Sequence, residues 1–384
     1  MFELLIAGGR VIDPGTGLDR LADVGFADGK VAAIAADLPR GNAARVVDAT
    51  GKLVTPGLID LHTHVYWGGT SLGVNADGVG PDSGTTTFID AGSAGAGNIL
   101  GFRRHVIERS DVRILAFLNI SFAGIFAFSR RVMMGECGDL RLCDAREAVA
   151  AVREHLPVIS GIKVRVGRHA GDSSGLAPLN IALEAADTLG LPVMAHLDDP
   201  PPSRGELVPK LRRGDILTHC FRGFPNAPVN GAGKVQDEIL AARARGVVFD
   251  IGHGMGSMSF ATTRQMLKNG FLPDVISSDI HALSAEGPAF DNLVTLSKFL
   301  CLGLPLADVL RMGTTAPAAA IARPDLGVLA EGGVGDAAVL ELRHGRFNYV
   351  DAAGEVLVGD CRLVSHGIAV GGRWLPGSGA VVGA

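Results

Sequence analysis

The sequence has few of the residues that cross-link small secreted domains. It contains 5 cysteines in 384 residues and no CxxC spacing, so neither a disulfide framework nor a structural zinc knot is indicated. Reduced and mostly buried thiols are expected. Aromatic residues are also scarce, at 5% of the chain.

An excess of positive charge is missing as well. The formal net charge is -5 and the isoelectric point is near 6.1, so no basic surface is available for phosphate backbones and nucleic acid is not the expected partner. The most apolar stretch, residues 116–128, is short and interrupted by Asn119 and Ser121, which excludes a membrane span there. The first residues lack the basic region and cleavage site of a secretory signal, so a cytoplasmic location is expected.

The chain does have ample material for a large core. Hydrophobic residues make up 47% and charged residues 20%, as in soluble globular proteins. The length fits one α/β barrel of about 250 residues with a smaller companion. A small-molecule substrate is the expected partner, and a homo-oligomer is compatible with the sequence.

Short β-like runs separated by Gly and Asp turns occupy both ends of the chain, at residues 1–55 and 335–384. Between them, apolar runs alternate with helical patterns, which is typical of repeated βα units. The eight strand candidates are 58–64, 85–93, 113–121, 161–167, 192–198, 215–221, 247–253 and 275–281. We therefore predict an α/β fold, a (β/α)8 TIM barrel over 56–334, with a small β-sandwich domain built from 1–55 and 335–384.

Metal-seeking residues lie at the carboxyl ends of these strands, which converge on one mouth in such a barrel. His62 and His64 are two apart in a strand and point to the same side, although a lone HxH pair is often chance or a satisfied core histidine. His196, His219 and Asp279 end three other strands. Four histidines and one carboxylate are a ligand mix suited to zinc and similar divalent ions.

Lys163 ends a further strand at the same mouth, where a buried ammonium beside cations would be unfavourable. A lysine that reaches solvent or pairs with an acid is the ordinary alternative. We hypothesise that its pKa is lowered and that the neutral amine reacts with carbon dioxide. The resulting carbamate, an N6-carboxylysine, has two oxygens that can bridge two metal ions.

The motifs PGLIDLHTH (56–64), GIKVRV (161–166), MAHLD (194–198), LTHCF (217–221), SSDIH (277–281) and GVGDAAVLEL (333–342) resemble those of the amidohydrolase superfamily, in particular its deacetylase and dihydroorotase-like branch with carboxylated lysine. The resemblance extends over essentially the whole chain. It implies that His62, His64 and Asp279 hold one metal ion, His196 and His219 the other, and carboxylated Lys163 bridges them together with a hydroxide. Zinc is the implied metal.

The same resemblance makes Asp279 the catalytic proton shuttle, which accepts a proton from the hydroxide and passes it to the leaving group. A dihydroorotase would carry Arg two residues after its HxH pair, whereas this chain has Tyr66. The loss of a bidentate carboxylate ligand argues against dihydroorotase activity.

Further candidates for substrate contacts are Arg165, Asn119, His253 and His281. Arg165 could equally be a structural ion-pair partner, and His253, in the Gly-rich GHGMGS, could cap backbone groups. GHGMGS and GTTT (84–87) lack the Lys-Ser/Thr ending of a phosphate loop. Cys220 alternates away from the mouth, so a core thiol is favoured over a nucleophile.

The expected activity is hydrolysis of an amide or ester bond in a small acylated compound, such as an N-acyl amino acid or an acetylated hydroxy acid. The alternative reaction is the opening of a cyclic amide, as in dihydroorotase, hydantoinase or dihydropyrimidinase. A non-catalytic barrel is the alternative of a different class, and the complete set of ligands argues against it.

Overall fold

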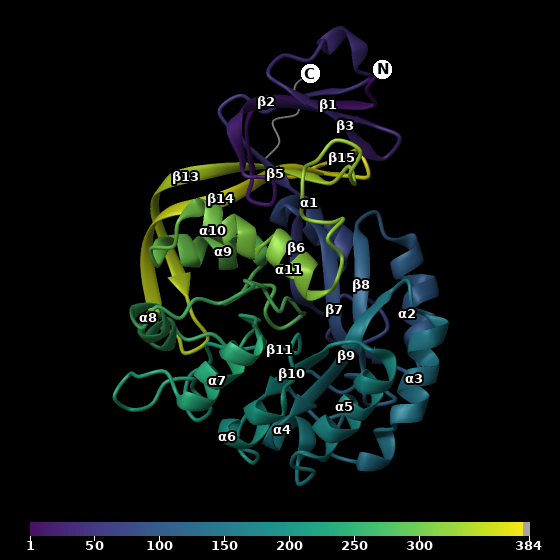
Figure 1. Cartoon of the computed structure of the whole chain (residues 1–384), viewed down its shortest axis with the longest axis vertical. Coiled ribbons are helices and arrows are strands. Elements are labelled where there is room, and N and C mark those ends of the chain that lie inside the picture. The colour runs from purple at the N-terminus through teal and green to yellow at the C-terminus, as the bar shows by residue number, and fades with distance from the viewer. Residues whose placement is uncertain (379–384) are drawn as a thin grey trace.

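The computed structural model describes residues 1–378, which form two β-sheets with helices around one of them (Figure 1). The larger part is built on a parallel sheet of seven strands in the order β12-β11-β10-β9-β8-β7-β6. These strands are β6 (Leu58–Thr63), β7 (Thr85–Gly95), β8 (Arg113–Asn119), β9 (Ile159–Val166), β10 (Val193–Leu197), β11 (Ile216–Leu217) and β12 (Val248–Phe249). All seven fall within or overlap the strands predicted from the sequence.

The eighth predicted strand, 275–281, is represented by single bridges. Val275 bridges Asp250, next to β12, and Ile280 bridges Thr63 at the end of β6. The segment therefore contacts both edges of the seven-stranded sheet, which curls into a TIM-barrel-like arrangement. The regular parts of β11 and β12 are also short, since only two residues of each predicted seven are in strand geometry.

Helices cover the outer side of the curled sheet (Figure 1). Four of these helices are α3 (Ala145–Glu154), α5 (Ala177–Leu189), α7 (Asp237–Arg245) and α10 (Leu306–Met312). The Asp144 side chain caps the start of α3 by accepting from two backbone N–H groups, and Gly190 and Gly246 end α5 and α7 in left-handed conformations.

The remaining helices are α1 (Ala76–Ser83), α2 (Ile99–His105), α4 (Arg168–Gly171), α6 (Arg204–Leu207), α8 (Phe260–Lys268), α9 (Asn292–Cys301) and α11 (Thr315–Ala320). No helix in residues 1–378 is long and apolar enough to cross a membrane.

The two chain ends share a second, mixed sheet, as the sequence predicted. Its order is β15-β14-β13-β5-β1-β2-β3, and β4 pairs with β1. The strands are β1 (Leu4–Asp13), β2 (Leu18–Ala27), β3 (Lys30–Ala35), β4 (Val46–Asp48), β5 (Leu53–Pro56), β13 (Ala337–Val350), β14 (Val356–Val370) and β15 (Arg373–Pro376). β5 lies between parallel β1 and antiparallel β13, so it joins the N-terminal strands to the C-terminal ones.

One apolar cluster positions the functional site. It joins side chains of different parallel strands, among them Ile59, Ile89, Phe117 and Met194. The Met194 Sδ atom lies 3.4 Å from Lys163 Nζ, so this cluster lies directly against the predicted metal-binding residues. The predicted metal-binding residues thus pack against a layer of closely packed apolar side chains.

Candidate active site

A small cavity of about 40 Å³ brings together all six predicted metal-binding residues. Residues from six different segments of the curled sheet and its loops line it. They are His62, His64, Leu72, Ile125, Phe128, Lys163, Arg165, His196, His219, Asp279 and His281. Of the five candidate substrate residues, Arg165 and His281 line this cavity, and Tyr66, Asn119 and His253 do not.

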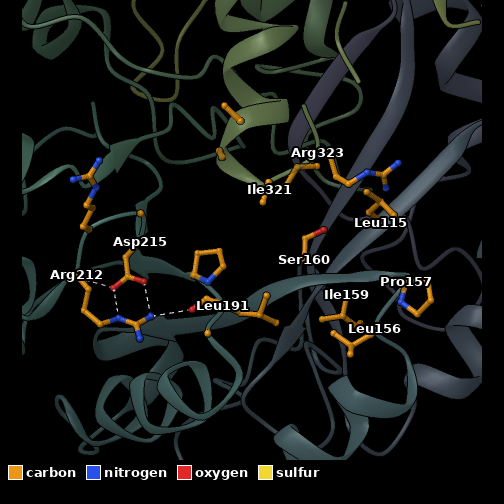
Figure 2. A pocket seen from close by; sticks show the side chains of 17 residues that line it. Leu115, Leu156, Pro157, Ile159, Ser160, Leu191, Arg212, Asp215, Ile321 and Arg323 are labelled. Carbon is orange, nitrogen blue, oxygen red and sulfur yellow. Dashed lines mark hydrogen bonds and ion pairs between the residues drawn. The ribbon is translucent and has the colours of Figure 1, made fainter. Parts of the chain in front are cut away.

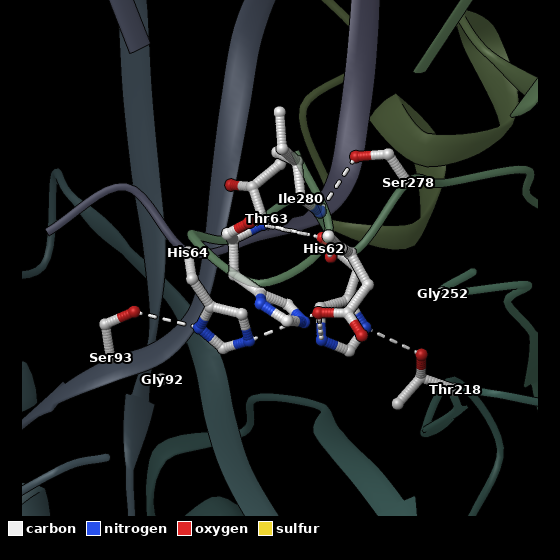
Figure 3. Close-up of polar contacts among 12 residues, drawn as sticks. His62, Thr63, His64, Gly92, Ser93, Thr218, Gly252, Ser278 and Ile280 are labelled. Atoms are coloured by element: carbon white, nitrogen blue, oxygen red, sulfur yellow. Dashed lines mark hydrogen bonds and ion pairs between the residues drawn. The ribbon is translucent and has the colours of Figure 1, made fainter. Parts of the chain in front are cut away.

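His62, His64 and Asp279 converge on one point. Asp279 Oδ1 lies 3.4 Å from His62 Nε2 and 3.4 Å from His64 Nε2. One ligand atom from each of the three residues lies within 4.8 Å of the others, so a single ion can contact all three (Figure 3). These are the three residues that the sequence assigned to one metal ion.

His196 and His219 form the neighbouring half of the cluster. Their ring centroids are 4.5 Å apart, and the ring of His219 lies 5.0 Å from that of His62. The Nε2 atom of His196 is buried and has no hydrogen-bond partner within residues 1–378. A buried imidazole nitrogen without a partner is costly, and a metal ion would satisfy it.

The other ring nitrogens of three histidines are occupied. His62 Nδ1 lies 2.7 Å from Thr218 Oγ1, and His64 Nδ1 lies 2.9 Å from Ser93 Oγ (Figure 3). His219 Nδ1 donates to the carbonyl oxygen of Gly252 at 2.6 Å. With the proton held on Nδ1, Nε2 keeps its lone pair for the cavity, as in metal sites where a second group orients each imidazole.

Burial keeps the imidazoles neutral. It lowers the pKa of His62, His196 and His219 well below the ordinary histidine value, and that of His64 to about 3. Neutral imidazole is the form that binds metal ions. Burial also raises the pKa of Asp279 to about 6.

Two of the predicted ligands have strained backbones. His219 has φ +58° and Asp279 has φ +50°, in the left-handed region that few non-glycine residues adopt. The Asp279 N–H donates to the His62 carbonyl oxygen at 2.7 Å, and Ser284 Oγ donates to the Asp279 carbonyl at 3.0 Å. Such strain clusters at functional sites, where surrounding contacts hold it in place.

Lys163 is fully buried and forms no salt bridge with an acid in residues 1–378. Its Nζ lies 3.3 Å from His62 Nε2. Burial lowers the pKa of Lys163 to about 7, so a neutral amine is accessible near neutral pH. Gly92, at φ +84°, leaves room for the lysine stem, because a Cβ there would lie 2.6 Å from Lys163 Cγ.

The donor set therefore fits divalent metal ions. Imidazole and carboxylate ligands suit zinc and similar ions, and His196, whose Nε2 atom has no hydrogen-bond partner within residues 1–378, lines the cavity. The short distances from Asp279 Oδ1 to the Nε2 atoms of His62 and His64 would allow one ion to contact all three side chains.

The residues behind the ligands, chiefly Asp250, were not predicted from the sequence. Thr218 Oγ1 donates to Asp250 Oδ2 at 2.7 Å, and Ser277 Oγ donates to its Oδ1 at 2.6 Å. His62, Thr218 and Asp250 thus form a hydrogen-bonded chain. Burial raises the pKa of Asp250 to about 6. An acid within the apolar run VVFDIGH is the signal that could have identified it.

Three candidate substrate residues make contacts within the protein instead. Tyr66 stacks on Phe102 with ring centroids 4.5 Å apart. The Asn119 amide donates to the Gly92 carbonyl at 3.0 Å, and His253 contacts a buried lysine on α9.

A larger cavity of about 610 Å³ lies at the opposite ends of the strands, lined by Ile159 and Ser160 at the start of β9 (Figure 2). Two of its arginines are paired: Arg212 Nη2 lies 2.7 Å from Asp215 Oδ1, and Arg323 Nη2 lies 2.7 Å from Asp325 Oδ2. The cavity lacks converging ligand or nucleophilic groups among the described residues that line it, so the smaller cavity is the candidate active site.

A TIM-barrel-like sheet with imidazoles and carboxylates at its strand ends defines a metal-binding hydrolase. The model of the amidohydrolase family matches residues 53–365, and the chain belongs to this family. It is accordingly a hydrolase that acts on C–N bonds.

Named relatives come from several branches of the family. A deacetylase of Agrobacterium fabrum is 35% identical over 334 residues, which cover 86% of this chain and 80% of that protein. A deacetylase of Enterococcus faecalis is 31% identical over 320 residues, with coverage of 83% and 84%. The crystal structure of an adenine deaminase aligns with a TM-score of 0.90 and 29% identity, covering 98% of this chain and 100% of the other. A dihydroorotase structure aligns at 0.89 with 30% identity, covering 98% and 99%.

Proposed function

We propose that the protein hydrolyses the amide or ester bond of a small acylated compound, as a deacetylase of N-acyl amino acids or acetylated hydroxy acids. The observation that carries the proposal is the convergence of Asp279 Oδ1 on the Nε2 atoms of His62 and His64 inside a small cavity. The 35% identity to a deacetylase over most of both chains supports the deacetylase assignment.

We further propose two divalent metal ions, which the ligand chemistry indicates are zinc. His62, His64 and Asp279 would hold one, and His196 and His219 the other, with an N6-carboxylysine at Lys163 between them. When bound, such a pair polarises a carbonyl and acidifies water. The absence of an acid partner for buried Lys163 within residues 1–378 supports carboxylation, because the amine is otherwise left without a counter-ion.

The residues of the chain supply orientation and proton transfer. Thr218, Ser93 and the Gly252 carbonyl fix the imidazole rings so that Nε2 faces the substrate. Asp279 accepts a proton as water attacks the scissile carbonyl and donates it to the departing amine or alcohol. Its pKa, raised to about 6 by burial, lies near neutral pH, which suits a group that must both take and give a proton.

The same proposal assigns the fold in finer detail. Residues 56–334 would form a (β/α)8 TIM barrel closed by 275–281. Residues 1–55 and 335–384 would form the two parts of a small β-sandwich, of which residues 379–384 lie outside the part of the chain that the structure describes. The bridges of Val275 to Asp250 and of Ile280 to Thr63 support closure, and the pairing of β5 with β13 supports a shared terminal unit.

Cyclic amide hydrolysis is the second candidate, favoured by the likeness to a dihydroorotase structure at 30% identity. A substrate screen distinguishes the two activities. It measures kcat/KM of the metal-loaded enzyme for N-acyl amino acids, acetylated hydroxy acids, cyclic imides and adenine. Preference for an acylated compound is the expected result. Preference for rings or for adenine would replace the proposal.

A further inference from the structure

Arg165 is placed to bind an anionic group of the substrate. It lies two residues after Lys163 on β9 and lines the same cavity. Its Nη1 donates to Glu136 Oε2 at 3.0 Å, and its Cζ atom lies 5.4 Å from the ring centroid of Phe128. The ion pair thus fixes one edge of the guanidinium, and the aromatic ring covers it from one side.

The other edge of the guanidinium is free. The hydrogen bond to Glu136 is the one contact of this kind that Arg165 makes within residues 1–378, although a guanidinium carries several further N–H donors. No guanidinium nitrogen of Arg165 is a buried atom that lacks a hydrogen-bond partner. The residue lines the cavity and is 8% exposed. Its remaining donors therefore open toward the space in which the substrate must lie.

Glu136 holds the guanidinium of Arg165 in a fixed position. Its side chain is fully buried in the segment after β8, and the Asn119 amide lies 3.5 Å from Oε1 while Oε2 accepts from Arg165. A buried arginine held along one edge by a fixed carboxylate is pre-organised, so a ligand loses little entropy in meeting it.

The charges around the cavity leave Arg165 as its cationic side chain. Five histidines line the cavity, and the amine of Lys163 lies 3.3 Å from His62 Nε2 within the proposed metal site, so Arg165 is the lining cation outside that site. Leu72, Ile125 and Phe128 supply the apolar part of the wall. The lining is complementary to a small compound with an apolar body and one carboxylate.

We propose that the substrate bears a carboxylate, which Arg165 binds through its free edge, with Glu136 as the positioning residue. The inference rests on the proposed hydrolase function and specifies its substrate class as anionic acyl compounds. Planar guanidinium and carboxylate groups match in a bidentate pair, and such charge-assisted hydrogen bonds are about twice as strong as neutral ones.

The test compares each N-acetyl amino acid with its C-terminal carboxamide. For the wild type, we expect kcat/KM for the carboxylate to exceed that for the amide by roughly 10- to 100-fold, the size of a hydrogen bond to a charged group. In Arg165→Met this preference should disappear through a higher KM for the carboxylate, with the amide changed little. Arg165→Lys should restore part of it, because the charge returns without the planar fork.

Two further variants separate binding from structure. Because Arg165→Met leaves Glu136 buried without a partner, the double variant Arg165→Met/Glu136→Gln removes both charges and keeps the fold. Arg168→Met, at an exposed arginine at the start of α4, is the matched control and should keep the carboxylate preference. Metal content should be equal in the wild type and in the four variants. If Arg165 had a general structural role, the metal content of its variants should differ from that of the wild type.

Binding can be measured without turnover. In an Asp279→Asn background, calorimetric titration with the carboxylate and with the carboxamide should show the same preference, lost when Arg165→Met is added. Equal affinity for the two compounds would overturn the inference. A wild-type enzyme that binds the carboxylate selectively but hydrolyses no acylated compound would overturn the proposed function and leave the anion site in place.

Discussion

Lys298 Nζ lies 2.6 Å from His253 Nε2, and both side chains are fully buried. The amine also donates to the carbonyl oxygens of Pro288 at 2.7 Å and Val350 at 2.9 Å, so three acceptors surround it. His253 Nδ1 lies 2.9 Å from the Gly254 carbonyl, which places the ring proton there and leaves Nε2 to accept. Lys298 therefore ties α9 to the loop after β12 and to β13.

Replacing Lys298 with Met should destabilise the protein. The change leaves the buried Nε2 atom of His253 and two partly buried carbonyl oxygens without their donor, and we expect the free energy of unfolding to fall by about 3 kcal/mol. Turnover should fall as well, because the neighbouring Gly252 carbonyl orients His219 and Gly254 lies against the Asp279 carboxylate. Urea unfolding and kcat of the same preparation measure the two effects.

Lys268→Met provides the matched control, since this lysine is exposed at the end of α8. Its unfolding free energy should stay within about 0.5 kcal/mol of the wild type. Equal stability of the Lys298 and Lys268 variants would show that water replaces the lost donor.

Thr218→Val should weaken metal binding without a large change in shape. The substitution removes the hydroxyl between His62 Nδ1 and Asp250 and leaves a side chain of similar volume. Loss of such a supporting hydrogen bond typically lowers metal affinity by roughly 10- to 100-fold. Competition with a chelating dye measures it, and Thr188→Val, exposed on α5, should bind as the wild type does.

Asp279→Asn should lower kcat by roughly 10²- to 10⁴-fold, the range expected for loss of a general acid and base. The amide cannot take up and return the proton, although its oxygen can still act as a ligand. Stopped assays together with metal analysis test this. Turnover near the wild-type value in metal-replete protein would remove Asp279 from the proton-transfer role, and Asp237→Asn on the exposed start of α7 is the control.

Removal of metal by a chelator should abolish activity and lower the melting temperature, because ions bound only by the folded state stabilise it. Reactivation should require both a divalent ion and bicarbonate, since carboxylation of Lys163 consumes carbon dioxide. A carbamate signal from ¹³C-bicarbonate is expected in the NMR spectrum of reloaded wild type and not of Lys163→Ala. Full reactivation without bicarbonate and without that signal would argue for a bare lysine.

The sequence was sufficient to predict the regular strands and helices of the molecule. Strands β6 to β10 were predicted to within a few residues because each is an apolar run bounded by turn residues, and α3 and α5 carry clear caps. The six predicted ligands do line one cavity, since carboxyl ends of parallel strands meet at one face.

The irregular segments of the chain have no periodic sequence pattern from which their structure could be predicted. The strand predicted over 275–281 forms only bridges, and the left-handed backbones of His219 and Asp279 interrupt the regular geometry at the site. Glu136 and Phe128 come from the long segment between β8 and α3, whose path depends on tertiary contacts alone. For His253, the sequence left substrate contact and the capping of backbone groups as alternatives, because its position in GHGMGS says nothing about Lys298, which lies 45 residues later.

The position of β5 bears on how the protein is made. Its neighbours are β1, in the N-terminal segment, and β13, which begins at Ala337. During translation the N-terminal strands therefore expose an unpaired edge until β13 has emerged, and such an edge is a site for pairing with other chains. A nascent chain that stalls before residue 337 should depend on chaperones, whereas release of the C-terminal strands closes that edge.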